Sequence, residues 1–253
     1  MRRASILIVA AALLAGCGSA KRAVTVTTTV TESASTATTA ATTAATTTTP
    51  QQQSLELYFL DPSDHKLYAV RKQIEPTQAV GAAALQELAV GPDTEVPPNL
   101  SLRIANGDAH VSGSTLSPGA TAQVVYTLTQ FPTVKSVDGK KRADVERFVP
   151  PILVEDPTAD ETVTSPLRVT GNADTFEATF EADLKDAAGR VLHHQVVTAT
   201  SGSGTRGTFA FTIPFSESHE GDGTLVVYER SAADGSIIHK REIELRLRPA
   251  ASR

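Results

Sequence analysis

Three segments near the end of the chain place an apolar side chain at every second position, and this alternation constrains the fold more than any other feature. The segments are residues 176–184, 209–215 and 243–247. A period of two predicts β-strands with one buried and one solvated face. About seven strands without a helical period between them predict an all-β sandwich of two packed sheets over residues 149–248. The four remaining strands are expected at 152–154, 167–173, 191–197 and 225–228.

The composition limits both the core of such a sandwich and the partners of the chain. The 253 residues include one Cys and no Trp. The disulfide and Trp that form the core of antibody domains are therefore missing, and no metal site can be built from several cysteines. The formal charge of −5 excludes a globally basic nucleic-acid binder, so no nucleic-acid partner is expected.

Residues 54–148 show a different pattern, in which helices and strands mix. Segments 55–60 and 67–71 are predicted strands around the turn sequence 61–64. Pro76 is predicted to open a helix that ends at Gly91, and Ser117 is predicted to cap a second helix. With short strands expected around 100–104, 109–111 and 134–137, these elements predict an α+β domain in the order ββαββαβ.

The beginning of the chain is predicted to be an export signal. Arg2 and Arg3 precede an apolar run at 6–14 that is too short to span a bilayer. The run ends in Leu14, Ala15, Gly16 and Cys17, which resembles a bacterial lipobox. Residues 1–16 are therefore predicted to be a lipoprotein signal peptide, and Cys17 to be acylated. The alternative is an ordinary secretory signal followed by a chance Cys.

A lipid on Cys17 implies a location on the extracytoplasmic face of the bacterial cell membrane. Residues 17–53 are almost all Thr, Ala, Ser and Val after the Cys, and they contain no aromatic residue. Such a segment cannot bury enough apolar surface to fold, so we expect a disordered stalk with an average span of roughly 30–36 Å. The stalk is either an unmodified tether or an O-glycosylated one. Residues 249–253 are expected to form a short tail.

The two predicted domains resemble known families. Residues 54 to about 140 resemble the sporulation and spore-germination domain called GerMN, through Gly91-Pro92 and the run Val-Val-Tyr-Thr-Leu-Thr-Gln-Phe-Pro-Thr-Val at 124–134. Residues 150–248 resemble the immunoglobulin-like domain of bacterial spore-germination proteins. The segments that carry this second resemblance are 165–171, 176–178, 186–192, 207–211 and 234–236.

The resemblance implies a role in assembly rather than in catalysis. GerMN domains are similar to the ring-building motifs of envelope and secretion assemblies, which oligomerise or dock. The chain departs from the family between Pro92 and Ser117, where the segment is shorter than usual. It also has Val-Ser-Gly-Ser at 111–114 where the family commonly has Val-Asp-Leu-Ser. Sporulation by the source organism is not implied.

Two features of the predicted sandwich are candidates for a catalytic nucleophile or a metal site. Ser203 lies between Gly202 and Gly204, but the sequence lacks the Gly-x-Ser-x-Gly spacing of a nucleophile elbow, so we expect a hairpin loop. His193 and His194 are adjacent on a predicted strand. Their side chains therefore point to opposite faces and cannot share one metal ion.

Two acidic groups and one basic run are the remaining candidate binding sites. A solvated polar loop is favoured over a weak metal site for both acidic groups. The alternative is Ca²⁺ or a transition metal for the group in one loop, and Ca²⁺ for the group near the first strand. The basic run Lys140-Lys141-Arg142 is expected to be an exposed linker between the domains. No cofactor, metal site or catalytic residue is predicted. The acidic groups are His219, Glu220 and Asp222 in one loop, and Asp156, Asp160 and Glu161 near the first strand of the sandwich.

These observations predict a non-catalytic lipoprotein of the cell envelope that acts as a protein-docking or assembly module. Its expected partners are envelope proteins or further copies of itself, with attachment to the membrane through the lipid and possible contact with peptidoglycan. The alternative is a module that binds peptidoglycan or another glycan of the wall, although the absence of Trp disfavours a sugar-stacking surface. A wall hydrolase is a third reading.

Overall fold

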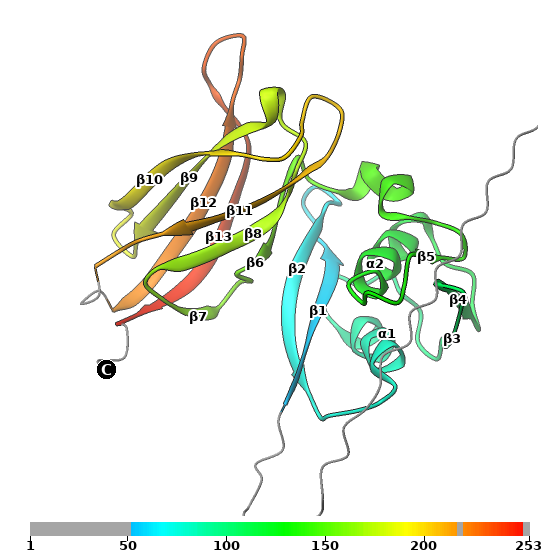
Figure 1. The fold of residues 1–253 in the computed structure, drawn as a ribbon. Coiled ribbons are helices and arrows are strands. Elements are labelled where there is room, and N and C mark those ends of the chain that lie inside the picture. Colours follow the sequence, from blue (N-terminus) through cyan, green and yellow to red (C-terminus); the bar gives the residue numbers. More distant parts are fainter. Residues whose placement is uncertain (1–51, 217–219, 250–253) are drawn as a thin grey trace, which may run out of the picture. The chain divides into compact units, whose positions relative to one another are not determined.

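The computed structural model describes residues 52–216 and 220–249 (Figure 1). The predicted signal peptide, Cys17, the stalk before residue 52 and the last four residues lie outside the described residues. The elements in chain order are β1 (Gln53–Leu60), β2 (Leu67–Ile74), α1 (Val80–Val90), β3 (Ser101–Ala105), β4 (Asp108–Ser112), α2 (Pro118–Leu128), β5 (Ser136–Val137), η1 (Arg142–Phe148), β6 (Ile152–Asp156), β7 (Glu161–Thr164), β8 (Leu167–Ala173), η2 (Phe176–Ala178), β9 (Thr179–Asp186), β10 (Val191–Thr198), β11 (Gly207–Ile213), β12 (Gly221–Arg230) and β13 (Ile237–Arg248).

The predicted fold class is confirmed. The elements from β1 to β5 follow the order ββαββαβ, and with the 3-10 turn η1 they form what we call the α+β domain. In it, β1 and β2 form an antiparallel hairpin, while β3, β4 and β5 form a separate small sheet. Both helices pack against β1 (Figure 1). The elements from β6 to β13 form the sandwich domain.

The first helix begins at Val80 and not at Pro76, so the predicted start was wrong. Two side chains hold the intervening residues outside the helix: Thr77 accepts a hydrogen bond from the Ala79 amide, and Gln53 accepts one from the Thr77 amide. The predicted end at Gly91 is confirmed. A Cβ at this position would lie 2.3 Å from the Phe59 ring, so the chain can leave the helix along this path only with glycine there.

Helix α2 seals the free edge of β1 with polar side chains. Ser117 caps its N-terminus by accepting from the Ala120 amide, as predicted. Further along, Thr127 Oγ1 accepts from the Tyr58 amide at 3.1 Å, and Gln123 Nε2 donates to the Tyr58 carbonyl. Gln123 and Thr127 are fully buried. Since buried backbone groups need partners, these side chains replace the strand that would otherwise pair with β1.

The sandwich domain contains eight strands in two sheets, one more than predicted. The order is β10-β9-β12-β13-β7 in one sheet and β11-β8-β6 in the other. The missed strand, β7, is four residues long, pairs parallel with β13 and buries only Val163. In place of a disulfide and a Trp, the core uses aromatic contacts, with the rings of Phe180 and Phe209 4.9 Å apart and edge to face.

The strand predicted over residues 176–184 begins three residues later than expected. Residues 176–178 form the short turn η2, in which Glu177 and Ala178 have positive φ angles of 54° and 58°. A left-handed backbone cannot continue a strand. Phe176 consequently points away from the core and is 55% exposed, although the alternating pattern placed it inside.

The two domains share part of a core. Leu153 lies on β6 of the sandwich domain, yet it is buried in the hydrophobic cluster of the α+β domain. Contacts join the described residues into one compact unit, so the boundary between the domains at 148/149 stays a prediction. No helix in the described part of the chain has the length and apolarity needed to cross a membrane.

The seal on β1 generates a first prediction. Thr127→Val keeps the shape of the side chain but leaves the buried Tyr58 amide without its acceptor, so we expect the free energy of unfolding to fall by about 1–2 kcal/mol. Urea denaturation measures this change. Thr121→Val, on the same helix but near the surface, is the matched control and should have a much smaller effect. Equal losses in both variants would contradict a role for Thr127 in sealing the strand.

Candidate functional site

The candidates predicted within the sandwich have structural partners. Ser203 lies in a loop with a φ of 54°, and its hydroxyl accepts a hydrogen bond from the Glu177 amide. His193 and His194 lie on β10 with their side chains on opposite faces, as predicted. His193 Nε2 lies 3.3 Å from Gln195 Oε1, and His194 Nδ1 lies 2.7 Å from Asp183 Oδ1. The structure does not bring these three residues together.

Neither predicted acidic group is arranged to hold a metal ion in the described part of the chain. His219 lies outside the described residues, and Glu220 and Asp222 are exposed. Asp156 and Glu161 both bind the guanidinium of Arg71, from the α+β domain, at 2.6 and 2.7 Å. Across residues 52–216 and 220–249, no group of three or more His, Cys, Asp or Glu side chains is placed to hold a metal ion.

Arg142 corrects the prediction for the basic run. Lys140 and Lys141 are exposed, as an exposed linker requires, but Arg142 turns inward at the junction of the domains. Its guanidinium carbon lies 4.4 Å from the ring centroid of Tyr126, and Nη1 lies 2.9 Å from Glu155 Oε1. Planarity lets an arginine stack on an aromatic ring and donate from its edge at the same time. The run therefore contains a structural arginine that joins the two domains.

Glu155 is the centre of this junction. Its Oε1 accepts hydrogen bonds from Arg142, from Asn172 Nδ2 at 3.1 Å and from the Tyr58 hydroxyl at 2.9 Å. The same hydroxyl lies 2.5 Å from Glu56 Oε1. A phenol has one proton to donate, so two carboxylates around it are best satisfied when one of them carries a proton.

The surroundings of Glu56 favour its protonated form. Burial raises the pKa of the Glu56 carboxyl above its ordinary value of 4.5, and the charge of Glu155 raises it further, while the hydrogen bond from Tyr58 opposes the shift. Burial and the same two carboxylates raise the pKa of Tyr58 well above 10, so Tyr58 keeps its proton. Protonated Glu56 can then donate to Tyr58, which donates to Glu155.

Two ion-pair clamps flank the junction. Arg71 of β2 reaches Asp156 and Glu161 in the sandwich domain. Arg241 of β13 reaches back to the turn after β1, to Asp61 at 3.4 Å and to Asp64. These partners are separated by 85 to 180 positions in the chain, and no local sequence pattern marks them. Composition and spacing therefore could not have identified them.

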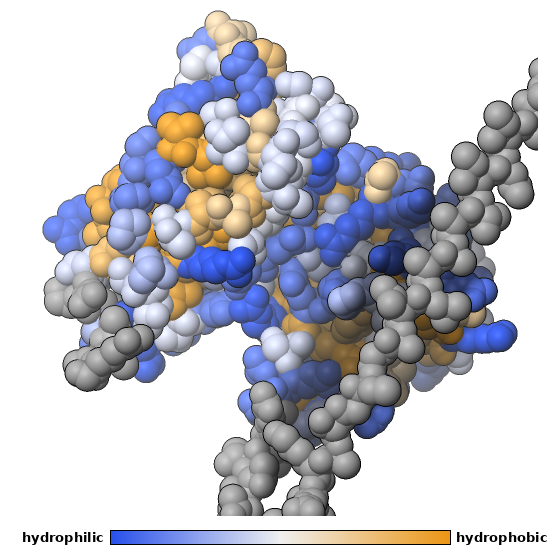
Figure 2. Space-filling view, viewed as in Figure 1, coloured by the Kyte–Doolittle hydropathy of each residue, from blue (hydrophilic) through white to orange (hydrophobic). Residues whose placement is uncertain are grey.

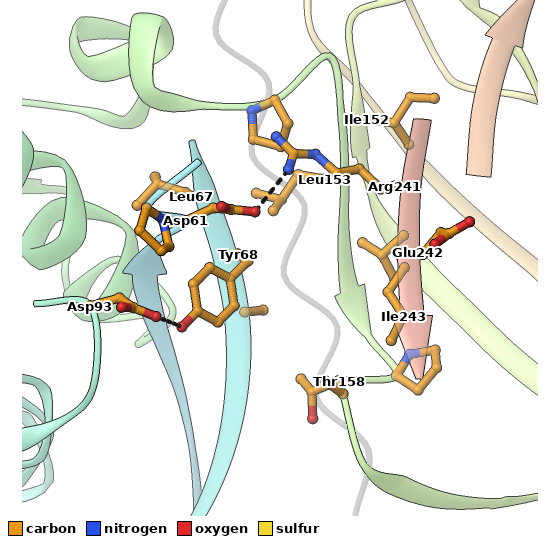
Figure 3. Close-up of a pocket in the computed structure, with 16 residues that line it drawn as sticks. Asp61, Leu67, Tyr68, Asp93, Ile152, Leu153, Thr158, Arg241, Glu242 and Ile243 are labelled. Carbon is orange, nitrogen blue, oxygen red and sulfur yellow. Dashed lines mark hydrogen bonds and ion pairs between the residues drawn. The ribbon is translucent and has the colours of Figure 1, made fainter. Parts of the chain in front are cut away.

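Between the clamps, the two domains enclose a cleft of about 300 Å³ (Figure 3). It lies where β2 runs beside β6, with β13 contributing Arg241 and Ile243. Polar groups are the minority: the Tyr68 hydroxyl donates to Asp93 at 2.9 Å, Asp61 pairs with Arg241, and Thr158 and Glu242 complete the polar lining. The remaining walls are mostly apolar and include Pro62, Leu67, Ala69, Pro150, Ile152, Leu153, Val154, Pro157 and Ala159.

The titratable groups that line the cleft have partners within the chain. Burial, the hydrogen bond to Asp93 and nearby negative charge raise the pKa of Tyr68, so its hydroxyl stays protonated at neutral pH. Asp61 and Asp93 each already face a partner. An apolar hollow of this size with polar groups at its rim fits one or two aliphatic or aromatic side chains of a bound chain.

Each of the two domains matches a known family. Residues 56–140 match the family described as "Sporulation and spore germination". Residues 151–236 match the family described as "Immunoglobulin-like domain of bacterial spore germination". Both resemblances predicted from the sequence are confirmed. Neither family is a known enzyme family. No curated protein matches the chain.

Solved structures resemble the chain only distantly. CopC from Methylosinus trichosporium OB3b is 15% identical, covers 40% of this chain and 98% of its own, and has a TM-score of 0.27. The tandem GerMN domains of the sporulation protein GerM from Bacillus subtilis are 12% identical, cover 80% of this chain and 63% of their own, and have a TM-score of 0.29. The ZIG-8–RIG-5 IG1–IG1 heterodimer is 11% identical, with shares of 38% and 87% and a TM-score of 0.20.

The raised pKa of Glu56 generates a second prediction. A carboxyl whose pKa is raised in the folded state contributes stability that is present below pH 4.5 and is lost as the pH rises through the raised value. Glu56→Gln mimics the protonated form at every pH. We therefore expect its melting temperature to exceed that of the native chain at pH 8 by more than at pH 4.

Thermal unfolding followed by circular dichroism across this pH range measures the difference. Glu75→Gln, at an exposed carboxylate, is the control and should show a difference that does not change with pH. A pH-independent difference for Glu56→Gln as well would place the shared proton elsewhere.

Arg142 generates a third prediction. Arg142→Lys keeps the charge but loses the planar fork that binds Glu155, Thr129 Oγ1 and the Tyr126 carbonyl together. We expect the free energy of unfolding to fall by about 1–3 kcal/mol in urea denaturation. Lys140→Ala, two residues away and exposed, should change it by less than about 0.5 kcal/mol. The two variants would behave alike if the basic run were an exposed linker throughout.

Proposed function

We propose that this chain, which joins a sporulation and spore germination domain to an immunoglobulin-like domain of bacterial spore germination, is a non-catalytic lipoprotein of the cell envelope that docks other proteins. The lipobox sequence Leu14-Ala15-Gly16-Cys17 supports acylation of Cys17 and attachment to the extracytoplasmic face of the membrane. The Thr-rich stalk then holds the folded domains away from the lipid. Envelope proteins, or further copies of the chain, are the proposed partners.

The cleft between the domains is the observation that carries this proposal. It is open, apolar and bordered by fixed ion pairs, and docking sites are commonly centred on such a pocket for a partner's anchoring side chain. The contacts of Glu155 and Arg142 hold its two walls together before any partner arrives. A preformed pocket binds without the entropic cost of ordering it, which favours docking.

The wall-binding alternative has less support. Sugar recognition generally uses exposed aromatic rings, and Tyr58 and Tyr126 are buried in the junction. Phe176 is the single aromatic side chain more than half exposed in the described part of the chain. A wall hydrolase would need a free acid and base, whereas the three carboxylates of the cleft are engaged: Asp61 by Arg241, Asp93 by Tyr68 and Glu242 by Lys240.

In-cell cross-linking of the full-length chain tests the proposal. A photoreactive residue is placed at Pro62, in the wall of the cleft, and the attached molecules are identified by mass spectrometry. We expect one or a few discrete envelope proteins to be recovered. Ala159→Trp adds a large side chain at an exposed position of the cleft, and it should reduce this recovery about tenfold or more.

Ala232→Trp is the matched control, because it adds the same side chain at an exposed alanine outside the cleft. It should leave recovery unchanged. Recovery that is equally strong in both variants would overturn docking at the cleft. Recovery of glycan without protein would favour the wall-binding alternative instead.

A further inference from the structure

Two of the four outer strands of the sandwich are protected against pairing with other chains, and a third is covered at one end. β7 is only four residues long. β6 lies beside β2 of the α+β domain, where Thr158 just beyond it accepts from the Arg71 amide. β11 is covered near its start by Thr200, which exchanges hydrogen bonds with Thr208. Short or covered edges are the usual means of preventing unwanted strand pairing.

β10 lacks these protections. It runs for eight residues along the outer edge of the five-stranded sheet, and in the described part of the chain it pairs only with β9 (Figure 1). Its sequence, Val-Leu-His-His-Gln-Val-Val-Thr, contains no Lys, Arg, Asp, Glu, Pro or Gly. Charged residues and prolines on an edge normally discourage pairing, so this strand is receptive apart from the bulge between Val191 and His193.

The exposed apolar side chains of the domain support the same reading. Val191 is 53% exposed and Val196 is 62% exposed, and both lie on β10. The register opposite β9 places Val191, His194 and Val196 on the outer face of the sheet, opposite Lys185, Asp183 and Glu181. Figure 2 shows hydrophobic residues (orange) reaching the surface among polar ones on the side of the sandwich that carries β10 and β11.

We propose that β10 pairs antiparallel with β10 of a second copy of this chain, across a two-fold axis through Gln195. This inference rests on the proposed function, since a lipid anchor confines the copies to one surface and raises their effective concentration. In this register Val196 lies opposite His194 of the second copy, and Val197 lies opposite His193. Each pair shares a face of the sheet, as antiparallel pairing requires.

A second copy fits this edge because the strand is complementary to itself. With no formally charged residue in β10, antiparallel pairing of two copies places no like charges opposite each other. The symmetric pairing also covers the exposed Val196 of both copies at once. It satisfies the free backbone groups of two identical edges and leaves neither strand open for further growth, as a closed two-fold interface should.

Disulfide cross-linking of the full-length chain in its native membrane tests the pairing. Gln195→Cys places two sulfurs near the two-fold axis, where opposite Cα atoms in antiparallel strands are about 4.5–5.5 Å apart and a disulfide can form. We expect a cross-linked dimer under mild oxidation. Val90→Cys, at a 73% exposed valine on α1, should give at least about tenfold less dimer. The native chain measures any contribution from Cys17.

A charge on the edge supplies the second readout. Val196→Lys, in the Gln195→Cys background, should reduce the dimer about tenfold, because each lysine would be brought close to the other copy. Val90→Lys in the same background is the matched control and should leave the dimer unchanged. Unaltered thermal unfolding shows that both variants still fold.

The outcomes separate this inference from the proposed docking site. Dimer formation by Gln195→Cys no greater than that of Val90→Cys overturns the pairing, and so does a cross-link to a different protein instead of a second copy. Val196→Lys should leave partner recovery at the cleft unchanged, and Ala159→Trp should leave the dimer unchanged. No partner recovery from the native chain, together with an intact dimer, would therefore count against the cleft alone.

Discussion

The arrangement of the two domains depends on one carboxylate, Glu155. It lies on the first strand of the sandwich domain and receives hydrogen bonds from Tyr58 and Arg142 of the α+β domain, and from Asn172 of its own. Removing a charged group from water is costly unless several donors replace the lost hydration. Because these donors come from both domains, the carboxylate is satisfied only when the domains are joined as observed. Separating them would leave both Glu155 and Arg142 short of partners.

The two ion-pair clamps on either side of Glu155 also join the domains, and their arginines come from opposite domains. Arg71 extends from the α+β domain to two carboxylates of the sandwich, whereas Arg241 extends from the sandwich to two carboxylates of the α+β domain. Each domain supplies the arginine of one clamp and the carboxylates of the other, so rotating either domain would separate both sets of ion pairs. The two clamps together therefore specify one relative orientation of the domains. Each pair is partly exposed, so its contribution to stability is modest and weakens with salt. Specificity of orientation is its main effect.

The parts that could be predicted from the sequence are those set by local physics. The Ser117 cap, the glycine end of α1 and the alternation of the strands depend on neighbours within a few positions, and all three were found. The failures have equally local causes. Gln53 and Thr77 hold the chain out of the helix after Pro76, and left-handed residues displace the start of β9. Neither effect changes the periodic pattern of apolar residues in the sequence.

The candidate site could not be predicted because it is made by long-range pairing. Arg142 is adjacent to two exposed lysines and has the same charge, so composition assigns all three to one linker. Only the approach of Tyr126 and Glu155 distinguishes it. The arginines of the clamps are likewise ordinary surface residues until their partners, up to 180 positions away, are known. Sequence analysis detects the period of apolar residues in helices and strands, and the residues at an interface between domains have no such period.

The edges of the strands differ in how far they are protected from pairing with other chains. The free edge of β1 is sealed from inside by Gln123 and Thr127, at the cost of burying polar side chains in a helix. β2 and β6 lie beside each other around the cleft and are restricted by the Arg71 clamp. β10 carries no formal charge and no sealing segment along most of its edge, and pairing with an identical strand is the use that we propose for it.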